Sequence, residues 1–135
     1  MSIIVTDQGF APDDYPGPIP PLADLDAAAR AVELTPSDRA EALTGRLAKL
    51  ELIRVIFPAF NDGRGFTIGH DLRRLGFTGR LRAAGHVLAD QYAMTRRAGF
   101  DEVEIPQDLA ARQPEAQWLA RADWRALDHR RRLFA

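Results

Sequence analysis

The residues best suited to binding chemistry lie within residues 61–67, where Gly63 and Gly65 flank Arg64 just before a predicted helix. Free N–H groups and the dipole at a helix start favour anions, and an arginine adds a two-pronged hydrogen-bond donor. Asp62 can brace the same turn through its side chain. Asp62, Gly63, Arg64 and Gly65 therefore predict a site for an oxyanion or phosphate. The alternative is a glycine-rich turn in which the Asp62–Arg64 pair is purely structural.

A second polar corner comprises Arg82, His86, Asp90 and Gln91, around the end of another predicted strand. Ligands of open α/β sheets bind beyond the carboxyl ends of the strands, so both corners are expected at that edge. In this hypothesis Arg82 and Arg64 hold the anion, while His86 or Asp90 transfers protons. A histidine at a strand–helix junction is more often a surface or capping residue. The residues identify no catalytic set.

The spacing of the glycines in residues 63–69 bears on whether the chain binds a dinucleotide. Gly63, Gly65 and Gly69 form G-x-G-x-x-x-G, one residue longer than the usual fingerprint, and Asp62 would place negative charge beside a pyrophosphate. Both points argue against NAD or FAD and leave a mononucleotide such as FMN as the better fit. Histidines and acids show no metal-ligand spacing, and the absence of cysteine excludes thiolate ligands. The sequence therefore identifies no cofactor and predicts no metal.

Strands and helices alternate along the chain. Residues 52–57 are a near-continuous apolar run, typical of a buried parallel strand, and 80–84 and 101–105 are shorter strand candidates. Helices are predicted over residues 22–31, 36–50, 67–75, 87–98 and 108–130, and Pro114 is expected to break or restart the last of them. This alternation predicts one α/β domain with a mainly parallel sheet of about four to five strands. Helices are expected on both faces, in a three-layer, Rossmann- or flavodoxin-like arrangement.

The first part of the chain differs from the rest in composition. Residues 1–21 are rich in proline and glycine and predict an extended segment ahead of the domain at 22–135. Eight acids and two arginines lie in the first 45 residues, whereas the whole chain has a net charge of −1 and a pI near 6.3. That balance argues against a general nucleic-acid binder. No apolar run reaches membrane-spanning length and no signal peptide is apparent, so a cytoplasmic protein is expected.

Three sequence blocks resemble a bacterial family of uncharacterised proteins, domain of unknown function 934. They are residues 57–66 (FPAFNDGRGF), 81–91 (LRAAGHVLADQ) and 97–101 (RAGFD), and the resemblance covers about residues 50–125. The family's motif residues correspond here to Asp62, Gly63, Arg64, Gly65, Arg82, Gly85, Asp90 and Gln91. His86 departs from the pattern, because an acid or amide is usual at that position.

Family members are typically encoded beside assimilatory sulfite reductase and are often labelled oxidoreductases of sulfite reduction. The resemblance therefore implies an accessory or partner protein of sulfite reduction, with sulfite reductase as the expected partner. The residues themselves leave open a small enzyme or sensor that binds an oxyanion, nucleotide or flavin at 61–67 and 85–91. The sequence decides neither the oligomeric state nor the identity of a small anionic ligand.

Overall fold

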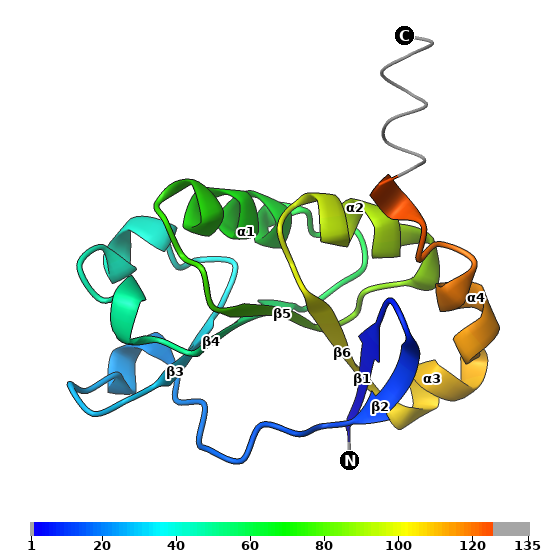
Figure 1. Cartoon of the computed structure of the whole chain (residues 1–135), viewed down its shortest axis with the longest axis horizontal. Coiled ribbons are helices and arrows are strands. Elements are labelled where there is room, and N and C mark those ends of the chain that lie inside the picture. Colours follow the sequence, from blue (N-terminus) through cyan, green and yellow to red (C-terminus); the bar gives the residue numbers. More distant parts are fainter. Residues whose placement is uncertain (1, 126–135) are drawn as a thin grey trace, which may run out of the picture.

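One sheet organises the chain, which a computed structural model describes over residues 2–125. The strands are β1 (Ser2–Thr6), β2 (Gly9–Pro12), β3 (Ala31–Leu34), β4 (Leu52–Phe57), β5 (Arg80–Gly85) and β6 (Glu102–Pro106). The α-helices are α1 (Arg64–Arg74), α2 (Tyr92–Arg97), α3 (Gln107–Arg112) and α4 (Glu115–Leu119) (Figure 1). The 3-10 helices are η1 (Leu22–Asp24), η2 (Ala40–Leu43), η3 (Leu47–Lys49) and η4 (Ala89–Gln91).

The sheet has six strands in the order β2-β1-β6-β5-β4-β3. Strands β3 to β6 are parallel, and β1 is antiparallel to both β6 and β2. A single α/β domain with a mostly parallel sheet is thus confirmed. The sheet is mixed and has more strands than predicted, because the hairpin formed by β1 and β2 joins it.

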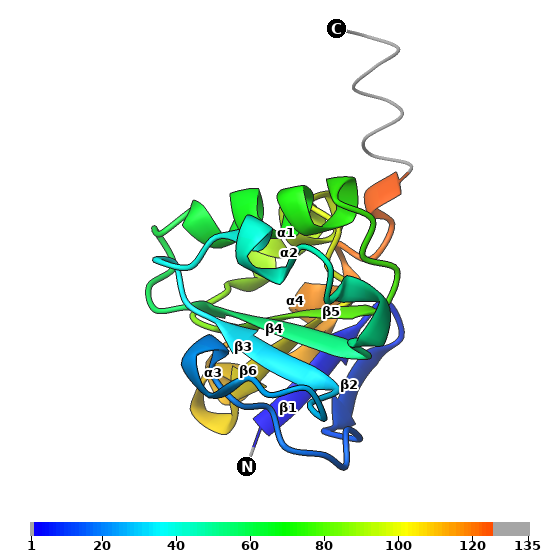
Figure 2. The ribbon, with the colours of Figure 1, turned by 90° about the vertical axis from the view of Figure 1, so that its left-hand side faces the viewer.

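The three-layer arrangement predicted from the sequence is not confirmed. Each parallel strand lies beside its predecessor, and right-handed connections between such strands all fall on the same face of a sheet. Helices α1 and α2 accordingly cover one face, while residues of the N-terminal segment run below the other (Figures 1 and 2). A doubly wound fold needs a reversal of strand order to place helices on both faces, and the described parallel strands contain no such reversal.

The hydrophobic core lies between the sheet and α1 and α2. Alternate residues of the parallel strands point into it, including Ile53, Val55 and Phe57 of β4 and Leu81 and Ala83 of β5. Trp118 of α4 is also buried and meets the Tyr92 ring edge-on, with the ring centroids 6.0 Å apart. Within residues 2–125, none of the helices is long and apolar enough to cross a membrane.

Two predicted helices are wrong. Residues 36–50 form the short helices η2 and η3, separated at Gly45, whose φ of +85° is incompatible with an α-helix. The Asp38 carboxylate accepts hydrogen bonds from the Thr35 N–H (2.8 Å) and hydroxyl (3.2 Å), which closes a turn at the start of this segment. Within residues 22–31 the helical structure is limited to the single turn η1, and Ala31 begins β3.

The helical stretch predicted over 108–130 is interrupted at Pro114, as the sequence predicts. The chain leaves α3 at Gln113 with φ of −126° and re-enters a helix after Pro114, because proline cannot continue an α-helix from within. Residues 126–130 of that prediction lie outside the described residues.

Candidate functional site

The two predicted corners meet at one edge of the sheet, which we call the carboxyl edge and define as residues 58–65 and 86–91. Gln91 joins them. Its side-chain carbonyl accepts a hydrogen bond from the Leu88 N–H (2.9 Å), and its amide group donates one to the Phe60 carbonyl (2.6 Å). Gln91 therefore positions the loop after β4 against the loop after β5.

Arg64 begins α1 and is held by Asp62 rather than left free. Its Nε and Nη2 donate to the two carboxylate oxygens of Asp62 at 3.0 and 2.7 Å, and its backbone N–H donates to the same carboxylate at 3.2 Å. Hydrogen bonds from the Arg64 side chain and backbone hold the pKa of Asp62 below its usual value. The Arg64 side chain remains 62% exposed. The Asp62 carboxylate thus holds the residue that begins α1 and neutralises its charge, while the Arg64 side chain stays accessible.

The two glycines beside Arg64 differ in what surrounds them. A Cβ atom on Gly65 would lie 2.4 Å from the Phe57 ring, which is itself in contact range of Phe66 and Phe100, with ring centroids 5.0 and 5.8 Å away. At Gly63 the nearest atom to a Cβ would be 4.0 Å away, in the Phe66 ring. Gly65 is therefore required by the packing of the helix against β4, and Gly63 is not.

His86 and Asp90 lie on the surface of this edge. The His86 side chain belongs to an exposed residue, and its backbone N–H donates to the Phe57 carbonyl (2.9 Å), which continues the β4–β5 pairing. The Asp90 side chain is 80% exposed and forms an ion pair with Arg121. Asp90 therefore links the start of η4 to the segment after α4.

A groove lies beside Arg64, between η2 and α1. Its volume is about 300 Å³, and Arg39, Arg64 and Thr67 contribute to its lining. Three acidic residues, Asp38 before η2, Glu41 of η2 and Asp71 of α1, line it as well. The groove can accommodate a small anion, but its charges are mixed.

Arg82 does not join the carboxyl edge. It lies in mid-strand on the face of the sheet away from α1 and α2, and its side chain is 0% exposed. Its Nε donates to Glu102 (2.6 Å), its Nη1 donates to Glu104 (2.7 Å), and both Nη atoms donate to Asp13 (3.2 Å each). Arg82 and Arg64 are thus on different surfaces of the molecule, and the structure does not bring these two predicted anion ligands together.

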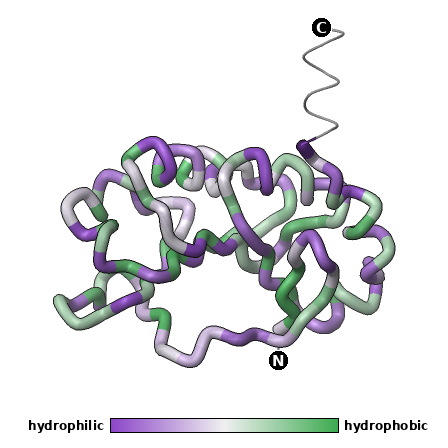
Figure 3. The backbone as a smooth tube through the Cα atoms, in the orientation of Figure 1, coloured by the Kyte–Doolittle hydropathy of each residue, from purple (hydrophilic) through white to green (hydrophobic). Residues whose placement is uncertain are grey.

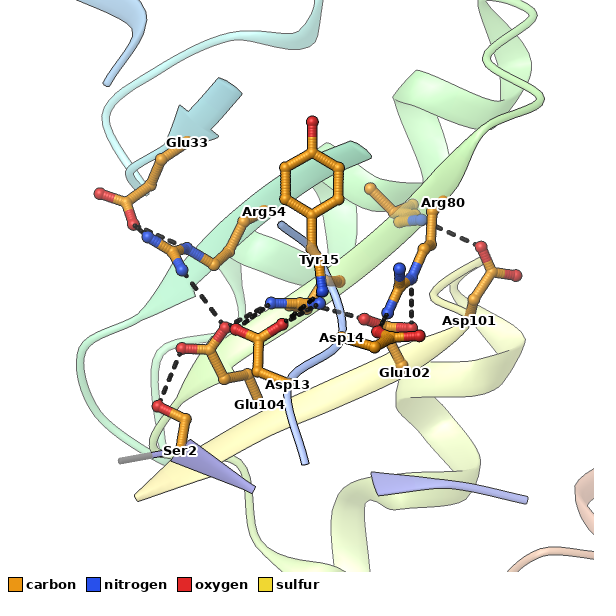
Figure 4. Close-up of polar contacts among 12 residues, drawn as sticks. Ser2, Asp13, Asp14, Tyr15, Glu33, Arg54, Arg80, Asp101, Glu102 and Glu104 are labelled. Atoms are coloured by element: carbon orange, nitrogen blue, oxygen red, sulfur yellow. Dashed lines mark hydrogen bonds and ion pairs between the residues drawn. The ribbon is translucent and has the colours of Figure 1, made fainter. Parts of the chain in front are cut away.

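Arg82 belongs to a charged row that sequence reasoning missed. The strand register places Glu33, Arg54, Arg82 and Glu102 side by side across β3, β4, β5 and β6. Arg54 donates to Glu33 (2.7 Å) and Glu104 (3.3 Å), and Arg80 donates to Glu102 (2.7 Å) (Figure 4). We call this surface the ionic face and define it by its three arginines and three glutamates, which are Glu33, Arg54, Arg80, Arg82, Glu102 and Glu104.

The N-terminal segment covers the ionic face. Residues 13–19, which we call the strap, run beneath β4 and β5, and Asp13 and Asp14 of the strap pair with Arg82 and Arg80 (Figures 1 and 4). Burial raises the pKa of Asp13, but hydrogen bonds from the Tyr15 N–H and from Arg82 outweigh it and lower that pKa. Asp13 is therefore ionised at neutral pH and pairs with Arg82 as a carboxylate.

A pattern in the sequence could have revealed the ionic face. Charged residues alternate with apolar ones in 80–82 (Arg-Leu-Arg) and 102–104 (Glu-Val-Glu), and single charges interrupt the apolar runs at Glu33 and Arg54. Figure 3 shows the same interruption, with hydrophilic positions (purple) breaking the hydrophobic (green) strands. Opposite signs on β3 and β4, and again on β5 and β6, favour cross-strand pairing.

Phe60 is the most exposed of the large hydrophobic residues that the structure describes at the carboxyl edge, at 59%. It lies between β4 and α1, on a loop fixed by the Gln91–Phe60 hydrogen bond and by a bond from the Asp62 N–H to the Ala59 carbonyl (3.1 Å). The charged pairs Asp62–Arg64 and Asp90–Arg121 belong to the same edge or its border. No group of three or more potential metal ligands occurs among residues 2–125.

The fold and its surfaces thus define a class: a small α/β protein with one helix-covered face, one ionic face and an aromatic loop at the carboxyl edge. The model of a family described as bacterial protein of unknown function (DUF934) matches residues 31–125. The chain belongs to this family, as its sequence motifs predicted. No curated protein matches the chain.

Proposed function

We propose that this protein is an accessory protein of assimilatory sulfite reduction and binds a protein partner, sulfite reductase, through the carboxyl edge. The identity of the partner follows from the family resemblance. The surface that would bind it follows from one observation: Phe60 is 59% exposed on a loop fixed by its own hydrogen bonds.

An exposed aromatic side chain on a fixed loop has the properties of an interface anchor. Aromatic residues dominate binding hot spots, and a loop that is already ordered loses little conformational entropy on binding. The charged pairs Asp62–Arg64 and Asp90–Arg121 supply polar groups of the kind that surrounds such anchors. The arrangement favours docking over chemistry, because the charged groups Asp62, Arg64 and Asp90 at this edge already have partners within the chain.

The direct test is the affinity of the purified full-length protein for assimilatory sulfite reductase holoenzyme. Phe60→Ser should weaken binding about 10-fold or more, since a hot-spot residue contributes about 2 kcal/mol. Leu119→Ser is a matched control, because Leu119 is an exposed apolar residue (42%) of α4, and it should stay within about twofold of wild type. Absence of binding by wild type at low and high salt would refute the partnership. Equal affinities of the two variants would refute this surface.

The second candidate is a sensor or small enzyme that binds an oxyanion, nucleotide or flavin at the carboxyl edge. It is favoured by the groove beside Arg64 and by the Gln91 contact that joins the two loops. A ligand at about 100 times its Kd should stabilise the fold by about 2.7 kcal/mol and raise the melting temperature by several degrees. A panel of sulfite, sulfate, phosphate, adenylyl sulfate, FMN, FAD and nicotinamide nucleotides tests this. The expected shift is present in wild type and lost in Arg64→Ala, which should fold because the side chain is exposed.

A further inference from the structure

We infer that the ionic face is a docking site for an acidic segment of a partner protein, and that the strap occupies this site as a built-in substitute. The occupant would present adjacent carboxylates to Arg80 and Arg82, as Asp13 and Asp14 do within the chain. This inference concerns a different surface from the carboxyl edge that holds Phe60 and does not rest on the proposed function.

The charges of the ionic face balance without the strap. Three arginines and three glutamates make up the ionic face, so its charges cancel before the strap is counted. Asp13 and Asp14 add two further carboxylates to arginines that the sheet already pairs. The strap is therefore not needed to neutralise the arginines, and its carboxylates use donors that remain available on them.

The guanidinium groups of Arg80 and Arg82 are held in place by the sheet itself. Arg80 and Arg82 are two residues apart on β5 and so point to the same side of the sheet. Glu102 accepts from the Nε of both arginines, at 2.7 and 2.6 Å, and so fixes both guanidinium groups from one side. Their outer Nη atoms face the strap. The Asp13 carboxylate accepts hydrogen bonds from both Nη atoms of Arg82, and the Asp14 carboxylate accepts one from Arg80. Two guanidinium groups that are fixed by the sheet and turn their outer Nη atoms to the strap form a receptor for paired carboxylates.

The strap is weakly attached to the sheet. None of its residues, 13–19, is fully buried, and Asp14 is 72% exposed. Pro16 and Pro18 lack the N–H that a sheet ladder requires, and the strap is tied by backbone pairing only just beyond it, where the Glu33 N–H donates to the Pro20 carbonyl (2.8 Å). Partly exposed ion pairs are weak and screened by salt. The segment can therefore lift while both of its ends stay attached to the sheet.

The test uses a labelled peptide with the strap's own sequence, residues 10–18, added to the full-length protein and followed by fluorescence anisotropy. Asp13→Asn with Asp14→Asn removes the built-in carboxylates and should raise the affinity for the peptide at least 10-fold over wild type. High NaCl should reduce this binding. A peptide with asparagine at both aspartate positions should bind at least 10-fold more weakly.

The control separates this effect from a general loss of negative charge. Asp24→Asn with Asp26→Asn changes the net charge equally at two exposed residues outside the strap and should bind the peptide as wild type does. Asp14→Asn alone, at a highly exposed side chain that folding does not require, should give an intermediate gain. Adding Arg80→Gln to the strap double variant should remove most of the gain. Equal affinities of the strap and control double variants would overturn the inference, and so would a gain that Arg80→Gln leaves intact.

Discussion

The two faces of the parallel sheet are built from the same strands but stabilised by different physics. On one face, Ile53, Val55 and Leu81 pack against helices, and burial of apolar surface provides the stability. On the other, alternate residues of the same strands form a row of ion pairs around Arg82. Truncation of a side chain on the helix-covered face leaves a cavity, whereas loss of a main partner of a buried ion pair leaves an uncompensated charge. Substitutions on the two faces should therefore differ in kind as well as in size.

The largest effect is expected at Arg82. Arg82→Met keeps much of the side-chain volume but leaves Glu102 and Glu104, both largely buried, without their main cation. Removing one partner from a buried ion pair typically costs about 3–5 kcal/mol, so urea unfolding should show a loss of that size. Arg112→Met, in an exposed pair with Asp108, is the control and should stay within about 0.5 kcal/mol of wild type.

A second substitution identifies the origin of that loss. Adding Glu104→Gln to Arg82→Met removes one of the stranded carboxylates and should recover part of the stability. A loss below about 1 kcal/mol for Arg82→Met alone would mean that packing, rather than charge, holds the ionic face.

The apolar face is tested at its closest approach. Gly65→Ala would place a Cβ 2.4 Å from the Phe57 ring, which Phe66 and Phe100 restrain, so overpacking should cost about 1–3 kcal/mol. Gly63→Ala meets open space at a φ of −85° and should change the unfolding free energy by less than about 0.5 kcal/mol. Thermal unfolding of both variants checks this contrast, and equal losses would show that backbone conformation, not the Phe57 contact, requires glycine here.

The contrast between the faces also explains what the sequence could predict. The strands at 52–57, 80–84 and 101–105 were located within a residue or two, because apolar runs and alternation are local signals. The partners of Arg82 were not, because they depend on which strands are neighbours and in what register, and neither is encoded within one segment. For the same reason the sequence predicted Arg82 at the carboxyl edge, where the structure does not place it. Gln91 and the Asp62–Arg64 pair could be located at that edge from local spacing.

A third prediction concerns acid, which should weaken the ionic face first. The pKa of Asp13 is lowered in the folded protein, so its stabilising contribution is present above the unfolded value near 3.8 and is lost as pH falls through the folded value. Asp13→Asn should therefore be less stable than wild type by about 1 kcal/mol at pH 7. Unfolding free energies measured from pH 7 to pH 2.5 should converge at the acid end; a difference that persists there would assign the loss to packing of the strap.

The smallest effect is expected where the ionic row reaches the sheet edge. Glu33 on edge strand β3 pairs with Arg54, but both side chains are partly exposed, at 24% and 21%. When Glu33→Gln removes one carboxylate, Arg54 keeps Glu104 and its existing exposure to water, so the loss should be about 0.5 kcal/mol. Glu102→Gln, the same change at 6% exposure, should cost several times more because Arg82 has no access to solvent. Urea unfolding of the pair measures the gradient along one row of side chains, and equal losses would mean that burial does not set the strength of these ion pairs.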